Sequence, residues 1–304
     1  MKLSLSVNES ADALINYFKN FSITSTTKSL PFEIDTKTNY FVAKATSELG
    51  DRVRYSALSF AECNVKVLED EGNGEHRVRV GINNKLDKFI KVMETVASTM
   101  EDIPEDQPKA FNIVVYFDAF VDRKETSYIC TGISFESPSI SIKYETDKAT
   151  GFDFIPDSVF FNKAIKLKDP VSFMLTPDRI KKIINVSDIV KVGGNDDILA
   201  FHLNGNEVWV YSDENPDASL FKLKLGNLLN DAVYNQIIAV RRRAFIDSLD
   251  KTNESFICST GITVIDVPAA TENEAPRTDE IVDRFVLKSE TTDTIVILAK
   301  LMDE

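Results

Sequence analysis

The sequence predicts an α+β fold of two similar domains, each built from two units of one strand, one helix and several further strands. Three observations lead to this prediction. Most of the 304 residues fall into short segments with alternating apolar and polar residues, the pattern of half-buried strands. Four segments instead repeat apolar residues at helical spacing. Each of the four follows a strand and precedes a run of strands, so one order occurs four times without clear residue identity.

The first predicted domain covers residues 1–165. Its first unit begins with a strand over 2–7 and a helix over 9–21, which Asn8 or Ser10 can cap. The helix places on one face Ala11, Leu14, Ile15 and Phe18. The strands that follow are predicted over 29–36, 39–46 and 52–60.

The second unit repeats this order with a strand over 76–82 and a helix over 83–98, which Asn83 or Asn84 can cap. The apolar stripe of this helix consists of Leu86, Phe89, Ile90, Met93 and Ala97. Three strands follow, over 111–120, 127–137 and 139–145. Residues 147–170 mix turn formers with aromatic residues and do not alternate, so we interpret this segment as the connector between the two domains.

The second predicted domain covers residues 166–304. Its first helix, over 178–190, is entered by Thr176 as the cap and Pro177 at the first helical position. Its second helix, over 241–251, has a weaker period. The predicted strands before and after the helices cover 171–175, 197–204, 207–212, 220–226, 236–240, 255–261, 262–267, 283–289 and 292–301. Residues 268–280 are polar and contain proline, which predicts a solvent-exposed loop.

The composition excludes several classes of protein. No apolar run approaches the ~20 residues of a membrane-spanning helix. The first ten residues lack the apolar segment of a secretion signal, and the three cysteines share no metal-binding spacing. We therefore expect a cytoplasmic protein with reduced thiols. The net charge of −13 argues against binding nucleic acid over the whole surface, but it permits one local basic patch.

Basic residues are concentrated on the four predicted helices. Their net charges are −1, +1, +1 and +2, a sum of +3, which leaves −16 for the rest of the chain. On the second helix Lys85, Lys88 and Lys91 lie opposite the apolar stripe. A solvated helix face explains any one such row. Several basic faces together indicate a surface that follows a phosphate backbone, in which contacts carry no sequence information.

Three consecutive arginines begin the fourth helix. Arg241, Arg242 and Arg243 lie in or beside the first turn, where the helix dipole disfavours cations. A bound phosphate would offset this cost. The alternative is that the run only crosses the end of a strand.

Several segments resemble the DNA sliding clamps, the processivity factors of replicative polymerases. The start of the chain, including ALINYFKNFSITSTTKSL, is most similar to the trimeric clamps of large tailed bacteriophages. PVSFMLTPDRIKKIINVSDIV resembles the opening of their second domain, and the segments over 237–267 and 292–301 resemble its close. The resemblance covers most of the chain at low identity and without a diagnostic motif. It implies a clamp fold, with helices on one face of curved antiparallel sheets.

The resemblance also implies functional residues. In the family the helices line the hole of a ring, which assigns DNA contact to Lys19, Lys85, Lys88, Lys91, Arg179, Lys181, Lys182, Arg241, Arg242, Arg243 and Lys251. Subunits join by edge strands, which assigns the interface to Ile140, Ile142, Tyr144, Phe221, Leu223 and Leu225. Partner peptides bind beside the connector, where candidates are Phe152, Phe154, Ile155, Phe160, Phe161, Leu301 and Met302. The alternatives are interior strands and residues that anchor the connector.

The implied function is a ring that encircles duplex DNA and tethers the polymerase. The implied partners are DNA, polymerase, a clamp loader and further copies of the chain, most simply a trimer. The location would be the host cytoplasm if a phage encodes the chain. We expect no catalytic residue, metal or cofactor.

Two other classes of function are compatible with parts of the sequence, an enzyme and a virion or scaffold protein. An enzyme needs convergent reactive groups, but His76 lies in a polar turn and His202 alternates within a strand. The glycines at 193 and 194 lack the lysine and spacing of a phosphate-binding loop. A virion or scaffold protein would suit an acidic, strand-rich repeat, but it gives no reason for basic helix faces that share one direction.

Overall fold

The computed structural model describes residues 1–22, 29–46, 52–72, 77–83, 86–122, 125–146, 166–190, 197–230, 234–249, 253–267 and 277–300. The chain divides into two compact units, one of Met1–Thr46 with Tyr55–Ile155 and the other of Ser47–Arg54 with Pro156–Glu304. The boundary expected near residue 165 lies outside the described residues, and it stays a prediction.

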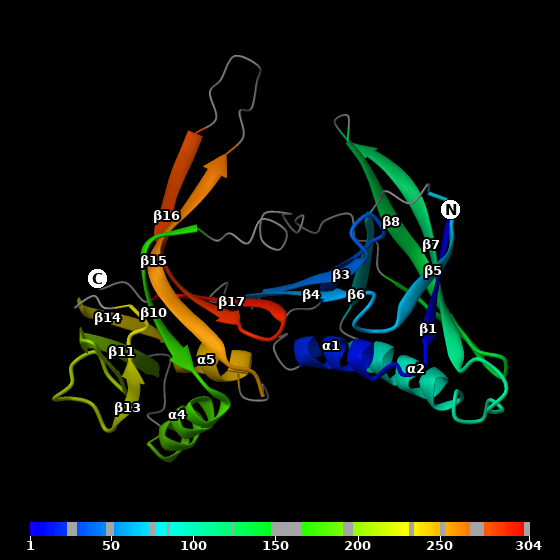
Figure 1. The fold of residues 1–304 in the computed structure, drawn as a ribbon. Helices are drawn as coiled ribbons and strands as arrows, with labels where there is room; N and C mark the ends of the chain where they lie inside the picture. The colour runs from blue at the N-terminus through cyan, green and yellow to red at the C-terminus, as the bar shows by residue number, and fades with distance from the viewer. Residues whose placement is uncertain are drawn as a thin grey trace. The chain divides into compact units, whose positions relative to one another are not determined.

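The first unit is a large sheet with two helices against it (Figure 1). Its elements are β1 (Lys2–Asn8), α1 (Asp12–Ser22), β2 (Ser29–Asp35), β3 (Tyr40–Thr46), β5 (Val65–Asp70), β6 (Arg77–Asn83), α2 (Leu86–Ser98), β7 (Ala110–Asp122), β8 (Glu125–Glu136) and β9 (Ser141–Tyr144). The strand order is β3-β2-β6-β8-β7-β1-β5, and β9 pairs with β8. Strand β4 (Arg52–Ser59) is divided between the two units.

Helices α1 and α2 lie side by side because their apolar stripes share one core with the sheet (Figure 1). Phe18 of α1 and Phe89 of α2 meet edge to face, with ring centroids 5.2 Å apart. Phe89 also contacts Phe135 of β8 at 5.5 Å. Burying rings of this size supplies much of the stabilisation of such a core. The same packing turns the polar side of each helix outward.

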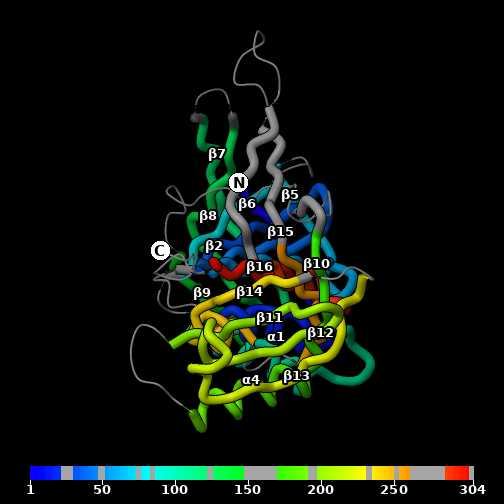
Figure 2. Tube along the Cα trace, turned by 90° about the vertical axis from the view of Figure 1, so that its left-hand side faces the viewer, coloured from blue at the N-terminus to red at the C-terminus, as the bar shows by residue number. Residues whose placement is uncertain are grey.

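The second unit contains two sheets and two helices. Its elements are β10 (Lys166–Leu175), α4 (Pro177–Ile189), β11 (Ile198–Gly205), β12 (Glu207–Tyr211), β13 (Lys222–Asn227), β14 (Tyr234–Arg241), α5 (Arg242–Leu249), β15 (Phe256–Val267), β16 (Arg277–Ser289) and β17 (Asp293–Ala299). One sheet has the order β10-β15-β16-β17, and the other has the order β13-β12-β11-β14 (Figure 2). Ile183 of α4, Phe245 of α5 and Phe201 of β11 are buried in their common core.

The predicted α+β class and the repeated order of strand, helix and strands are confirmed. The predicted cap of α4 is confirmed as well, since the Thr176 side chain accepts a hydrogen bond from the Arg179 amide. Helix α1 begins at Asp12, whose amide donates to Ser10 Oγ at 3.1 Å. Asn83, a predicted helix cap, is instead the last residue of β6.

Four strand predictions differ from the structure. Strand β10 begins at Lys166, inside the predicted connector over 147–170, and β16 begins at Arg277, inside the predicted loop over 268–280. The strands expected over 255–261 and 262–267 form one strand, β15, whose pairing with β16 shifts register beside Gly261. The glycine interrupts the alternation without ending the strand, as at a bulge. Strand β5 was not predicted. It lies at the edge of the sheet with only Val65 fully buried, so its sequence lacks a regular alternation.

Candidate nucleic-acid interface

Helix α2 presents an exposed basic row opposite its buried residues. Phe89, Ile90 and Met93 point into the core, whereas Lys88 and Lys91 are exposed. These two positions agree with the expected geometry of the helix wheel. Lys85 lies outside the described residues.

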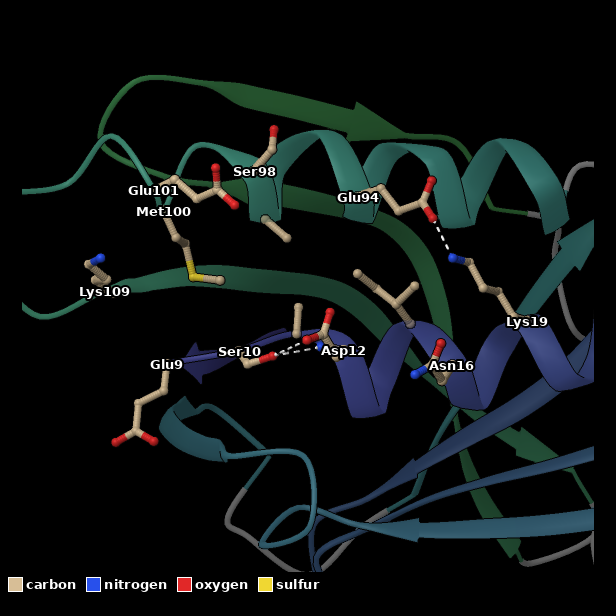
Figure 3. A pocket seen from close by; sticks show the side chains of 13 residues that line it. Glu9, Ser10, Asp12, Asn16, Lys19, Glu94, Ser98, Met100, Glu101 and Lys109 are labelled. Atoms are coloured by element: carbon tan, nitrogen blue, oxygen red, sulfur yellow. Dashed lines mark hydrogen bonds and ion pairs between the residues drawn. The ribbon is translucent and has the colours of Figure 1, made fainter. Parts of the chain in front are cut away.

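Helix α1 contributes one ammonium group, which forms an ion pair with α2. Lys19 Nζ lies 2.7 Å from Glu94 Oε1 of α2, and both side chains are nearly half exposed (Figure 3). An exposed pair of this kind contributes at most about 1 kcal/mol to stability. A phosphate could therefore displace Glu94 from Lys19 at small cost.

A cavity of about 440 Å³ lies between α1 and α2 and has an acidic rim (Figure 3). Its carboxylates belong to Glu9, Asp12, Glu94 and Glu101, against the ammonium groups of Lys19 and Lys109. This end of the helix pair is thus net negative. The exposed lysines of α2, Lys88 and Lys91, lie further towards the start of the helix, beside Asp87 of its first turn.

Helix α4 carries two exposed lysines and one arginine that serves the backbone. Lys181 and Lys182 are exposed. Arg179 is half-buried, and its Nη1 donates to the Met174 carbonyl at 2.9 Å. Its guanidinium lies over Gly226, where a Cβ would come within 2.9 Å of Nη2. Arg179 therefore stabilises the approach of β13 to the start of α4 instead of presenting its whole charge to solvent.

The three arginines at the start of α5 occupy three different environments. Arg243 is 84% exposed, with Nε 3.6 Å from Asp247 Oδ2. Arg242 is buried and pairs with Asp188, and its Nη1 lies 2.9 Å from Asp197 Oδ2. Arg241 is the half-buried last residue of β14. The two aspartates thus supply the counter-charge that the sequence interpretation had assigned to phosphate.

Two edge strands show the alternation expected of subunit contacts. Among the described residues β9 pairs only with β8, and β13 pairs only with β12. The expected interface residues lie on the core side of these edges: Tyr144 and Leu225 are buried, and Ile140, Ile142, Phe221 and Leu223 are partly buried. A further strand added to either edge would extend an existing apolar layer.

The remaining predicted residues lie outside the described part of the chain. They are Lys251 and the proposed peptide pocket of Phe152, Phe154, Ile155, Phe160, Phe161, Leu301 and Met302.

The described residues carry no evident reactive centre. They contain no cluster of three or more His, Cys, Asp or Glu side chains able to hold a metal ion. Burial raises the pKa of Cys63 to about 12 and that of Cys130 to about 11, so neither thiol is an activated nucleophile. Burial also raises the pKa of Cys258. His202 has its pKa lowered, mainly by burial.

Comparison with solved structures identifies the fold. No family model matches the sequence, and no curated protein matches it. PCNA of A. fulgidus, solved with the C-terminal region of FEN-1, superposes with a TM-score of 0.58 and 10% identity over 99% of both chains. PCNA of Thermococcus kodakaraensis gives 0.58 and 12% over 98% of this chain and 100% of that one. The DNA polymerase III beta chain of Streptococcus pneumoniae gives 0.57 and 12%, over 99% of this chain and 65% of that one.

The chain has the sliding-clamp fold. The four units of strand, helix and strands that the sequence predicts are the repeats of this fold, and the clamp helices are α1, α2, α4 and α5. The exposed lysines of α2 and α4 therefore lie on helices of the sliding-clamp fold. Within the described residues, no helix is long and apolar enough to cross a membrane.

Sequence reasoning missed the acids that accompany these cations. Glu94 follows Lys91 by three residues and was counted only as a charge, although it reaches Lys19 of another helix. Asp188 and Asp197 lie 54 and 45 residues from Arg242. Since no local spacing links such residues, the sequence contained no signal for these pairs.

Proposed function

We propose that this chain forms a ring around duplex DNA and tethers a DNA polymerase to its template. The observation that carries the proposal is a clamp fold in which exposed lysines occupy the outward faces of α2 and α4, although the whole chain carries −13. A protein with no use for DNA has no physical reason to gather its cations there.

The basic helix faces fit a DNA backbone without reading its sequence. Lys88, Lys91, Lys181, Lys182 and Arg243 are exposed cations on three clamp helices. Lysine ammonium groups act as point charges towards phosphates, and such contacts are the same for every sequence. The ring would hold DNA by enclosure, so weak and salt-dependent contacts suffice.

Ring closure uses the two edge strands. Strand β9 of one copy would add to β13 of the next, joining Ile140, Ile142 and Tyr144 to Phe221, Leu223 and Leu225. We propose a trimer, following the resemblance to phage clamps. A complex between two clamp chains is known for PCNA2 and PCNA3 of Sulfolobus tokodaii, which supports association between chains of this fold.

The proposed partners bind through the connector. Because the A. fulgidus clamp was solved with a C-terminal region of FEN-1, a peptide from a polymerase or clamp loader is the expected ligand here. We place it at the predicted pocket beside residues 147–170, and we place the assembly in the cytoplasm of a host cell. We propose no catalytic role, since binding and enclosure account for the function.

The test is retention on DNA of different topology. The native chain, loaded on nicked circular DNA with its cognate loader or at high concentration, should stay bound through gel filtration. It should be lost when the circle is cut once, because a ring slides off a free end. Equal retention on both forms would contradict enclosure.

Charge reversal tests the helix faces in the same assay. Lys88→Glu with Lys91→Glu should lower retention and polymerase stimulation more than tenfold, since each lost phosphate contact weakens binding. The matched control is Lys37→Glu with Lys66→Glu, which makes the same charge change at exposed positions away from the helices. An equal effect of both pairs would show that only net charge matters.

A further inference from the structure

The sheet of β13, β12, β11 and β14 has a second face that the clamp function does not use. Its core face carries Phe201, Leu203 and Val210 against α4 and α5. Alternation along the strands puts on the opposite face six residues: His202, Trp209, Tyr211, Lys222, Lys224 and Ile237. We name this surface the Trp209 face. Figure 2 shows the sheet that bears it, with β12 between β11 and β13.

The strand register brings these side chains into neighbouring rows. Trp209 pairs with His202 on one side and with Lys224 on the other. Tyr211 pairs with Lys222, and His202 also pairs with Ile237 of β14. Aromatic rings therefore occupy the two middle strands, and ammonium groups line one margin.

The lysines lie over the rings. Lys222 Nζ is 4.3 Å from the centroid of the Trp209 ring and 5.7 Å from that of Tyr211. Lys224 Nζ is 5.5 Å from the Trp209 centroid and also pairs with Glu207, which accepts a hydrogen bond from Trp209 Nε1. The rings of His202 and Tyr211 pack against each other with centroids 4.4 Å apart and planes tilted by 50°.

Solvent reaches the part of this face around Trp209, whereas Tyr211 is buried at 7% exposure. Lys222 and Lys224 are exposed, Trp209 is partly exposed, and Ile237 is 43% exposed beside His202. Lys222 and Lys224 both lie close to the carboxylate of Glu207 and form a cationic margin in a chain whose net charge is −13. An apolar and aromatic centre with a cationic margin favours a ligand that is both flat and anionic.

We propose that the Trp209 face binds a short segment of single-stranded nucleic acid, with a base stacked on Trp209 and phosphates at Lys222 and Lys224. Four-stranded sheets backed by helices bind two or three unpaired bases in this way. Duplex DNA hides the flat faces of its bases. An acidic peptide would use the lysines but leave the rings without a partner.

Binding would replace the Lys222 ammonium group over the Trp209 indole with a nucleic-acid base. In the free protein the Lys222 ammonium covers Trp209, and contacts of this kind are weak at exposed sites. A phosphate would draw the ammonium aside, and a base would take its place on the ring. Edgewise addition of a strand to β13 leaves this face open, so the inference holds whether or not the chain forms a ring.

Fluorescence offers a direct test because Trp209 is the only tryptophan of the chain. Titrating the native protein with a thymidine oligonucleotide should quench Trp209 to saturation, and the affinity should fall as salt rises. Lys222→Gln with Lys224→Gln should weaken binding about tenfold or more, since two phosphate contacts are lost. The matched control, Lys37→Gln with Lys66→Gln, removes the same charge at exposed positions away from the Trp209 face and the helices, and it should leave the quench unchanged.

Other outcomes would overturn the proposal. They are the absence of a saturable quench, a quench that the Lys222 and Lys224 variant retains in full, and a stronger quench by a polyglutamate peptide or a blunt duplex. The anisotropy of a labelled oligonucleotide gives a second readout for the same variants. Both substituted lysines are exposed, and a melting curve identical to that of the native protein confirms that the variant is folded.

Discussion

Arg242 and Arg243 are neighbours in sequence with opposite environments. Arg243 is 84% exposed, whereas the Arg242 side chain is 8% exposed and held by Asp188 and Asp197. A buried cation with two carboxylates is costly to remove, because both acids lose their counter-charge. An exposed arginine contributes little to stability but remains available to a phosphate.

This contrast predicts a separation of stability from DNA binding. Arg242→Met should lower the free energy of unfolding by about 2 kcal/mol, because charged hydrogen bonds are lost. Arg243→Gln should change the free energy of unfolding by less than about 0.5 kcal/mol. It should lower the slope of the logarithm of the DNA-binding constant against the logarithm of salt concentration by about 1, since one phosphate contact is lost. Urea unfolding and DNA titration over a range of salt measure the two effects. If Arg242→Met changed only the salt dependence, Arg242 would belong to the DNA surface after all.

Among the secondary-structure elements, the edge strands decide whether this chain can assemble. Within the described residues β5, β9 and β13 each pair along one side only. Strand β5 is protected by a shift in register beside Leu68 and by the ion pair of Lys2 with Glu69. Both are devices that discourage a further strand. Strands β9 and β13 instead have apolar residues on one side, to which another apolar layer can be added.

Hydrogen exchange should distinguish these edges. Raising the protein concentration from nanomolar to micromolar should slow amide exchange in β9 and β13, because assembly would pair their free amides. The peptide covering β5 serves as the internal control and should exchange equally fast at both concentrations. Equal slowing of all three strands would indicate general aggregation, and no slowing would contradict the proposed interface.

For the whole molecule, the proposed function depends on charge and enclosure together. The chain carries −13, yet its clamp helices present exposed lysines. The acidic surface would repel DNA outside the ring, and the basic helices would attract DNA phosphates inside it. In the proposed ring, enclosure would supply residence time without tight binding at any one site.

The mass of the native assembly tests this view. Three copies of 34.1 kDa give about 102 kDa, and native mass spectrometry at micromolar concentration should show this species. Dilution should return the single chain, since the proposed contacts are two strand edges. A mass of one chain at all concentrations would exclude the ring while leaving the fold unaffected.

Local periodicity explains how much could be predicted. The order of the helices and strands, the cap at Thr176 and the exposed lysines of α2 and α4 all follow from repeats of 2 or 3.6 residues, which act over a few positions. Strand β5 was not predicted because an edge strand with one buried residue has no such repeat. At Gly261 the sequence predicted a break between two strands, whereas the structure has one strand with a shift in register at that point.

The sequence by itself determined the elements, their order and the outward side of each helix. The tertiary structure alone decided that Arg242 meets Asp188 and Asp197, that Lys19 meets Glu94, and that Lys222 covers Trp209. The ion pairs join segments far apart in the chain, and Lys222 meets Trp209 across two neighbouring strands. They depend on which faces pack together, and no local repeat of residues encodes that choice.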